Sequence, residues 1–182
     1  MWCVTDLTRS LLDAAADLLA VHGSRGLRVV DVATRAAVSR QTVYNEFGNK
    51  ETLVRAVALD KTAQFLAGVR DRLEADPDPL DGLHAAASFV FAEAARDPLA
   101  CSVFSGANAE DMLPLVTTRG HEILDAAAEV FAAHVTTHWP HLPAERRTLI
   151  GETTVRLVLS HLLTPSGDAA AAVVTVTRAL LA

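Results

Sequence analysis

The sequence predicts an all-α fold of about nine helices. Apolar residues recur at helical spacing, as in the run Leu7, Leu11, Ala14, Leu18 and Val21, which would share one helix face. Alternation of apolar and polar residues never lasts, so no strand or hairpin is indicated. Segments rich in Pro, Gly and Asp, such as "DPDPLDG", separate the apolar stretches. Together these three observations indicate helices joined by short loops.

The composition is typical of a folded, soluble chain. Of the 182 residues, 51% are hydrophobic and 21% are charged, which suffices for a buried core and is far from a disordered composition. The segment "MWCVTDLTRS" lacks the basic start and apolar run of a signal peptide. No apolar stretch approaches the roughly 18 residues of a membrane span. We therefore expect a cytoplasmic protein with no membrane partner.

Neither a cofactor nor a metal ion is expected. Cys3 and Cys101 are far apart and form no CxxC pair, which argues against a disulfide scaffold and a zinc site. The histidines His134, His138 and His141 follow one another at helical spacing, but Pro140 breaks that helix and no cysteine is near.

The net charge of −6 is distributed unevenly. Residues 1–60 carry seven Arg and Lys against seven Asp and Glu, so their charges cancel. Residues 61–182 carry the other nine basic and fifteen acidic groups. The first part of the chain can therefore still face a phosphate backbone, although the protein as a whole is acidic.

Three helices are expected before residue 48. The first begins near Asp6 or Thr8 and ends before Gly23, and a second, short one covers residues 29–37. A third follows Ser39, whose hydroxyl can cap it by accepting a hydrogen bond from the N–H of Gln41 or Thr42. Val43 and Phe47 lie one helical turn apart and should face inward.

A long helix should follow this group and lead into the rest of the chain. Gly48 ends the third helix, and Asn49 caps a helix of about 26 residues, roughly 40 Å long. We place the head at residues 1–55 and a helical body at residues 56–182. Further helices are expected at about 80–96, 99–106, 114–139, 144–163 and 168–181.

Two short helices joined by a tight turn, on a third supporting helix, form the helix-turn-helix arrangement, whose second helix enters the DNA major groove. The side chains left on its outside suit that role. Arg40 can bind a guanine edge or a phosphate, Gln41 an adenine edge, and Thr42 a phosphate or a thymine methyl group. Tyr44 offers a phenol to a phosphate, Asn45 is also exposed, and Lys50 adds a charge beside free backbone N–H groups.

The segment "VSRQTVYNEFGNKETLV" after "VVDVATRAA" closely resembles the DNA-binding signature of the TetR family of bacterial repressors. The marks are Ser39 at the start of the recognition helix, Tyr44 followed by Phe47, and then Lys50, Glu51 and Leu53. The resemblance covers about residues 8–55. It implies that the tyrosine and the lysine contact phosphates.

Three residues depart from the family pattern. Ala37 stands where the family usually has glycine in the turn, so the turn must tolerate a Cβ. Arg28 stands where a threonine usually caps the second helix, although Arg28 can reach a phosphate instead. Glu46 adds a negative charge to the recognition helix. The arm before the first helix has no basic residue before Arg9, which argues against minor-groove contacts.

The resemblance implies that the body binds a ligand and dimerises, with its last two long helices paired against their mates in a four-helix bundle. The last helix is apolar nearly all round, with Arg178 as its only charge, so it must be buried on more than one side. A packed core within one chain would also explain it. We favour a homodimer, because symmetric dimers are common and half-site binding needs one.

A ligand pocket can form between the middle helices of the body. Apolar and aromatic candidates for its lining are Phe89, Phe91, Phe104, Met112, Leu124, Phe131 and Trp139. Possible polar anchors are Ser88, Asn108, His134 and His161. Aromatic residues and methionines at helical spacing are more often plain core. Because few charges are among them, we expect an apolar or amphipathic effector.

An enzyme is not indicated, since the sequence has no GxSxG, HExxH, P-loop or Rossmann glycine run. A helical protein-interaction module stays open as an alternative, but it does not need a capped helix surrounded by Arg, Gln, Tyr and Lys. The sequence therefore predicts a dimeric transcriptional regulator that binds duplex DNA. We expect a repressor that a small apolar ligand releases from a palindromic operator.

Overall fold

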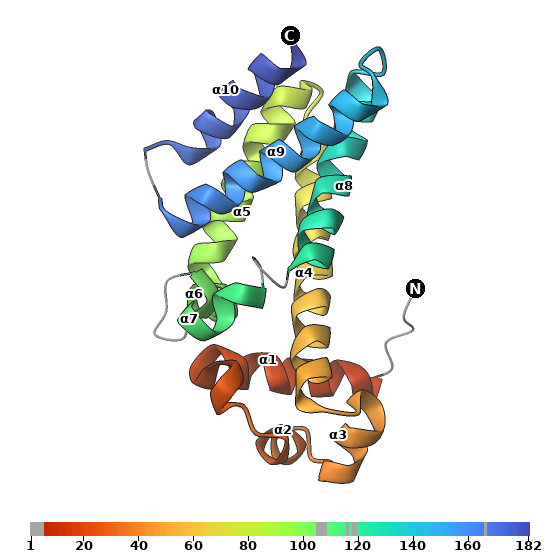
Figure 1. Ribbon diagram of the computed structural model, residues 1–182, viewed down its shortest axis with the longest axis vertical. Coiled ribbons are helices and arrows are strands. Elements are labelled where there is room, and N and C mark those ends of the chain that lie inside the picture. Colours follow the sequence, from red (N-terminus) through yellow and green to blue (C-terminus); the bar gives the residue numbers. More distant parts are fainter. Residues whose placement is uncertain (1–5, 105–108, 116, 118–119, 166) are drawn as a thin grey trace. The chain divides into compact units, whose positions relative to one another are not determined.

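The computed structural model describes residues 6–104, 109–115, 117, 120–165 and 167–182. Within these ranges the chain forms helices and no strand, which confirms the all-α prediction (Figure 1). Along the chain the elements are α1 (Asp6–Gly26), α2 (Val29–Arg35), α3 (Arg40–Phe47), α4 (Lys50–Ala75), α5 (Pro79–Arg96), α6 (Pro98–Phe104), α7 (Ala109–Met112), a 3-10 segment η1 (Leu113–Leu115), α8 (His121–His138), α9 (Ala144–Leu163) and α10 (Ala169–Leu181).

The chain divides into two compact units. Unit 1 comprises residues 1–62 and 96–119, and unit 2 comprises residues 63–95 and 120–182. Helix α4 runs without a break across the boundary after Thr62. The division predicted from the sequence, with a head of residues 1–55, stays a prediction. None of the described helices is both long and apolar enough to cross a lipid bilayer.

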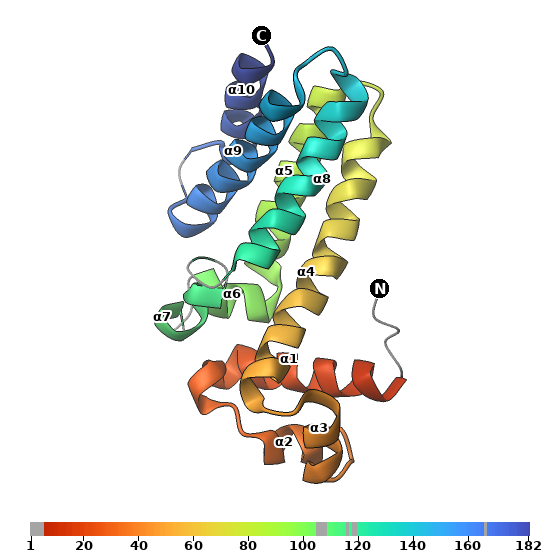
Figure 2. The same ribbon diagram turned by 45° about the vertical axis from the view of Figure 1, so that its right-hand side comes forward.

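Unit 1 has one apolar core that is built from distant parts of the sequence. Helices α1, α2, α3 and the start of α4 supply most of the buried residues, among them Leu11, Val32 and Leu53. Val103 of α6 and Met112 of α7 belong to the same core, and α6 packs against α1 in both views (Figures 1 and 2). Helix α1 kinks at Gly23, where φ is 66°, a value that glycine adopts without strain.

Unit 2 packs the second part of α4 with α5, α8, α9 and α10 around buried residues such as Val69, Ala86, Phe131 and Val173. Helices α8 and α9 approach closely, because a Cβ at Gly151 would lie only 2.7 Å from the carbonyl oxygen of Ala128. Helix α10 runs beside α9 (Figures 1 and 2).

Element boundaries agree with the sequence prediction in most places, but not between residues 109 and 121. The sequence predicted one helix over residues 114–139, whereas α8 begins at His121 after Gly120, and Pro114 lies in the 3-10 segment. Proline lacks an N–H and disfavours helical geometry in the residue before it, so a regular α-helix does not pass through this point.

Candidate DNA-binding face and the cavity of the helical body

The turn and the cap that begin α3 have the predicted local structure. Ser39 is extended, and its hydroxyl accepts a hydrogen bond from Thr42 N at 3.0 Å, which confirms the predicted N-cap. Before it, Ala37 has a φ of 54°, the only positive φ of a non-glycine residue in the described ranges. The Cβ is thus tolerated in the turn, but in a backbone conformation that disfavours it. Gly48, with φ 74°, ends α3.

Helix α3 buries one side and exposes the other. Val43 and Phe47 are 2% and 6% exposed and anchor α3 in the core of unit 1. On the exposed side, Arg40 donates from Nη2 to Tyr44 Oη at 2.9 Å, and its guanidinium lies 5.1 Å from the tyrosine ring centroid. The tyrosine ring itself packs against the core. Arg40 and Tyr44 therefore form one cationic, aromatic unit.

A second pair runs parallel to the first. Gln41 Nε2 donates to Asn45 Oδ1 at 2.9 Å, and both side chains are exposed. Thr42 is bonded to the cap, with 2.9 Å between the Ser39 and Thr42 hydroxyl oxygens. The structure thus brings the predicted DNA-contacting residues 39–45 onto one short helix and its cap.

Lys50 and Arg28 are near this helix but have partners of their own. Lys50 Nζ donates to the carbonyl oxygen of Arg25 at 3.0 Å. Arg28 precedes α2 without capping it through its side chain and instead bonds Asp31 at 2.7 and 3.0 Å. These hydrogen bonds raise the pKa of Arg28. Both cations remain partly or largely exposed.

Glu46 has a hydrogen-bond partner within unit 1. Its carboxylate accepts a hydrogen bond from the hydroxyl of Thr8 in α1, 38 residues earlier. Glu46 therefore ties α3 to α1 and serves the packing of unit 1. The local sequence showed only a negative charge on the recognition helix, because this partner is remote in the chain.

Two ion pairs link the helices α1, α2 and α4, which pack around α3. Arg9 of α1 contacts both carboxylate oxygens of Asp60 in α4 at 2.8 Å. Arg35 of α2 pairs with Asp17 of α1. In the first pair a single nitrogen, Arg9 Nη1, contacts both carboxylate oxygens, and the partly buried pair links α1 to the first part of α4.

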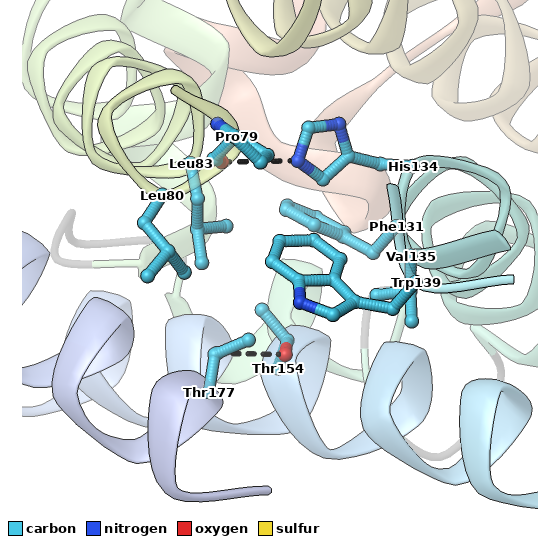
Figure 3. Close-up of a pocket in the computed structure, with 9 residues that line it drawn as sticks. All are labelled: Pro79, Leu80, Leu83, Phe131, His134, Val135, Trp139, Thr154 and Thr177. Atoms are coloured by element: carbon cyan, nitrogen blue, oxygen red, sulfur yellow. Dashed lines mark hydrogen bonds between the residues drawn. The ribbon is translucent and has the colours of Figure 1, made fainter. Parts of the chain in front are cut away.

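In unit 2, side chains from α5, α8, α9 and α10 converge on a small cavity (Figure 3). The lining comprises Pro79, Leu80, Leu83, Phe131, His134, Val135, Trp139, Thr154 and Thr177. The cavity volume that is open to the centre of a water molecule is about 10 Å³. This is room for about one water. In this conformation the side chains themselves fill the site, so a larger ligand requires them to move.

The polar groups at this cavity are few and paired. His134 is 9% exposed, and its Nε2 lies 3.0 Å from the carbonyl oxygen of Pro79. A carbonyl only accepts, so Nε2 carries the proton and Nδ1 of the neutral ring is an acceptor. Burial lowers the pKa of His134. The hydroxyls of Thr154 and Thr177 are 3.2 Å apart (Figure 3).

The predicted ligand-binding residues do not form one group. Phe131, His134 and Trp139 line the cavity. Phe91 and His161 make an edge-to-face contact elsewhere in unit 2, with ring centroids 6.2 Å apart.

The other candidates are scattered over both units. Leu124 and Phe89 pack against the core of unit 2, and Ser88 is half-buried in α5. Phe104 and Met112 belong to the core of unit 1. Asn108 lies outside the described residues.

Sequence reasoning missed the α5 residues and both threonines of the cavity. Thr154 and Thr177 are 2% and 4% exposed although their helices are otherwise apolar inside. Each threonine lies on the expected buried face of a predicted helix, and a polar residue in such a position could have indicated the cavity. In the described part of the chain, no three His, Cys, Asp or Glu side chains gather as a metal ion requires.

Helices α9 and α10 also expose apolar side chains. Leu149 is 57% exposed and Val176 is 40% exposed, and Leu163 at the end of α9 is exposed as well. Exposed apolar groups on adjacent helices are typical of a surface that another protein covers.

A capped recognition helix packed on α1, α2 and the start of α4 is the helix-turn-helix arrangement of a DNA-binding regulator, here joined to a second helical unit. Comparison with known proteins agrees. A family model described as "Bacterial regulatory proteins, tetR family" matches residues 11–57. Another, described as "Bacterial Tetracyclin repressor, C-terminal domain", matches residues 78–181. The chain belongs to the TetR family of transcriptional regulators.

Relatives of known identity support this assignment. The HTH-type transcriptional regulator AlkX of Mycobacterium tuberculosis (strain ATCC 25618 / H37Rv) is 34% identical over 164 residues, which cover 87% of this chain and 76% of the relative. This chain is thus similar over most of its length to a helix-turn-helix transcriptional regulator.

Solved structures share the fold over nearly the whole chain. The TetR family repressor AlkX from Dietzia sp. strain DQ12-45-1b, implicated in biodegradation of n-alkanes, has a TM-score of 0.71 and 26% identity, covering 97% of this chain and 94% of its own. The regulator FadR from Bacillus subtilis in complex with stearoyl-CoA has a TM-score of 0.64 at 20% identity, with 96% and 97% covered, which shows the common fold alone.

Proposed function

We propose that this protein is a cytoplasmic, homodimeric repressor that binds a palindromic operator through α3 and leaves it when an apolar or amphipathic molecule enters unit 2. The observation that carries the DNA contact is the exposed side of α3, where Arg40, Gln41, Tyr44 and Asn45 lie on one face above a buried anchor. A helix of this kind fits the major groove, and phosphate contacts from Lys50 and Arg28 would set its position.

The dimer would form through α9 and α10. Their exposed apolar residues, Leu149, Leu163 and Val176, offer a surface that a second copy can cover symmetrically. Two copies would present two recognition helices to successive major-groove segments about one helical turn apart.

The effector class follows from the lining of the cavity. Most of the lining is apolar, and burial lowers the pKa of His134, the one titratable side chain among the lining residues, which disfavours its charged form. An ionic sugar or a phosphate would have to give up its hydration there without a charged partner. A molecule with a hydrocarbon chain fits better, in line with the n-alkane biodegradation in which the Dietzia repressor is implicated.

Two measurements test the proposal together. The purified protein is first used to select binding sequences from random duplexes at low salt, and the winning duplex is then titrated by fluorescence anisotropy. We expect an imperfect palindrome and release by a long-chain fatty acid or alkanol, but not by a sugar phosphate. Selection of no sequence would instead favour a helical protein-interaction module.

A further inference from the structure

The two hydrogen-bonded pairs on α3 differ in the direction they face. Successive residues of a helix are about 100° apart around its axis. Gln41 and Asn45 therefore point directly away from the buried side, whereas Arg40 and Tyr44 lie at one flank. In a helix seated in the major groove, the central pair meets the base edges and the flanking pair meets the phosphates.

The flanking pair suits a phosphate. Tyr44 Oη accepts a hydrogen bond from Arg40, so the hydrogen of the phenol is left to be donated outward. Arg40 uses one of its five N–H groups in this bond and keeps the others for an anion. The base contact then falls to the central pair.

The amide of Gln41 has one edge that matches adenine. On that edge, the hydrogen of Nε2 on the same side as Oε1 donates to adenine N7, while Oε1 accepts from the N6 amino group. Nε2 carries a second hydrogen, and Asn45 Oδ1 is the acceptor beside it, 2.9 Å from Nε2. Donation of this second hydrogen to Asn45 leaves the adenine-matching edge open.

The same bond fixes the order of donor and acceptor. A free glutamine amide can turn by half a rotation, which exchanges its oxygen and its nitrogen at little cost. While Asn45 Oδ1 faces Gln41, as it does in this structure, only the orientation with Gln41 Nε2 toward it keeps the hydrogen bond. Guanine presents two acceptors, N7 and O6, and does not match a donor next to an acceptor.

We propose that Asn45 is a specificity-determining positioning residue, which holds the amide of Gln41 in the orientation that selects adenine at one position of each half-site. The inference rests on the proposed binding of α3 in the major groove. It assigns base selection to the Gln41–Asn45 pair and backbone contact to the Arg40–Tyr44 pair.

The test compares base preference with total affinity. The full-length protein and its variants are each used to select binding sequences from random duplexes. Comparison of wild type with Gln41→Ala identifies the position at which the variant no longer prefers adenine. The duplex selected by the wild type is then synthesised with guanine, or with 7-deazaadenine, at that position. For the wild type, we expect either change to weaken binding about tenfold, since a bidentate pair discriminates by about 1–3 kcal/mol. Loss of N7 alone removes one of the two bonds.

Three variants separate positioning from a structural role. Asn45→Leu removes the acceptor and should cut the adenine-to-guanine preference about fivefold, more than it weakens binding to unrelated duplex. Asn45→Asp keeps the acceptor, so it should keep the preference although its charge weakens all duplexes. The Gln41→Ala, Asn45→Leu double variant should show no greater loss of preference than Gln41→Ala alone.

The outcomes distinguish this inference from the function on which it rests. A wild-type preference in Asn45→Leu, or a lost preference in Asn45→Asp, overturns the positioning role while DNA binding stands. If Gln41→Ala has the same base preferences as the wild type, the positioning role is likewise overturned while DNA binding stands. A wild type that selects no duplex overturns the proposed function instead. Because residue 45 is exposed, these variants should keep the wild-type unfolding midpoint.

Discussion

The ammonium group of Lys50 lies 3.0 Å from the backbone carbonyl oxygen of Arg25, so the first residue of α4 closes the C-terminal end of α1. A cation there interacts favourably with a backbone carbonyl oxygen of the short turn beyond the kink at Gly23. The ammonium carries two further hydrogens. The same lysine can thus hold the support of the recognition helix and bind a phosphate.

Replacement of Lys50 by Met should therefore have two effects. The free energy of unfolding should fall by about 0.5–1.5 kcal/mol through loss of the hydrogen bond, as measured by urea denaturation. Affinity for all duplexes should also fall, and the slope of log K against log salt should decrease by about one. Lys61→Met, in the same helix, is the control. An unchanged salt slope would leave Lys50 with a structural role alone.

Ala37→Gly should stabilise the protein. Ala37 has a φ of 54°, and a Cβ in that region costs roughly 1–2 kcal/mol, against up to about 1 kcal/mol for the greater entropy of glycine in the unfolded chain. We expect a net gain of about 0.5 kcal/mol in urea denaturation. Ala36→Gly is the matched control, because Ala36 has a φ of −84° and should lose stability instead. Equal changes in the free energy of unfolding of both variants would contradict backbone strain at Ala37.

His134 should make stability depend on pH. Burial, with a smaller contribution from His138, lowers the pKa of His134 below 6.5, while the Pro79 carbonyl and Glu74 act in the opposite direction. Below pH 6.5 the unfolded chain binds a proton that the folded chain resists, so the free energy of unfolding should fall as the pH falls. His134→Gln keeps a donor for the Pro79 carbonyl without titrating, and its profile should be flatter in this range. Identical profiles in urea denaturation would contradict the assignment.

A charge on the exposed apolar side of α10 should separate the subunits. Val176→Glu puts a carboxylate on a side chain that is 40% exposed, so each chain should fold as before but remain monomeric. Sedimentation velocity gives the mass, and anisotropy should show loss of operator binding. Arg178→Glu, also exposed on α10, should stay dimeric. A wild type that is itself a monomer with full DNA affinity would refute the dimer.

The cavity should respond to a change in one aromatic side chain. Phe131→Leu enlarges the space next to His134 and Trp139 and keeps the position apolar, so the loss of stability should stay below the roughly 3–5 kcal/mol typical of Phe→Ala in a core. The concentration of effector that releases half of the operator should shift, while ligand-free DNA affinity stays within a few fold. Phe65→Leu, outside the cavity lining, is the control. The same shift in both variants would place the effector elsewhere.

Features set by neighbouring residues were predictable from the sequence. The cap at Ser39, the buried pair Val43 and Phe47 and the bounds of α4 all follow from contacts within a few residues. The roles of the exposed residues of α3 in DNA binding stay predictions.

Contacts between distant segments were not predictable. The partner of Glu46 is 38 residues away and that of Lys50 is 25 residues away. For the same reason, Met112 was expected in a ligand pocket but is buried in the core of unit 1. An apolar residue at helical spacing predicts that its side chain is buried, but it does not indicate in which of the two cores.

The core of unit 1 takes Val103 and Met112 from a segment that the chain reaches only after residues 63–95. During synthesis on the ribosome, the part of this core that Val103 and Met112 complete therefore stays open until α6 and α7 have been made. The same order limits the exchange of parts between regulators. A hybrid protein joined after residue 57, where the family match ends, would set a foreign α1 against these two side chains. To transfer operator preference to another regulator, one should therefore replace only the exposed residues of α3. The alternative is to transfer residues 1–62 together with residues 96–119.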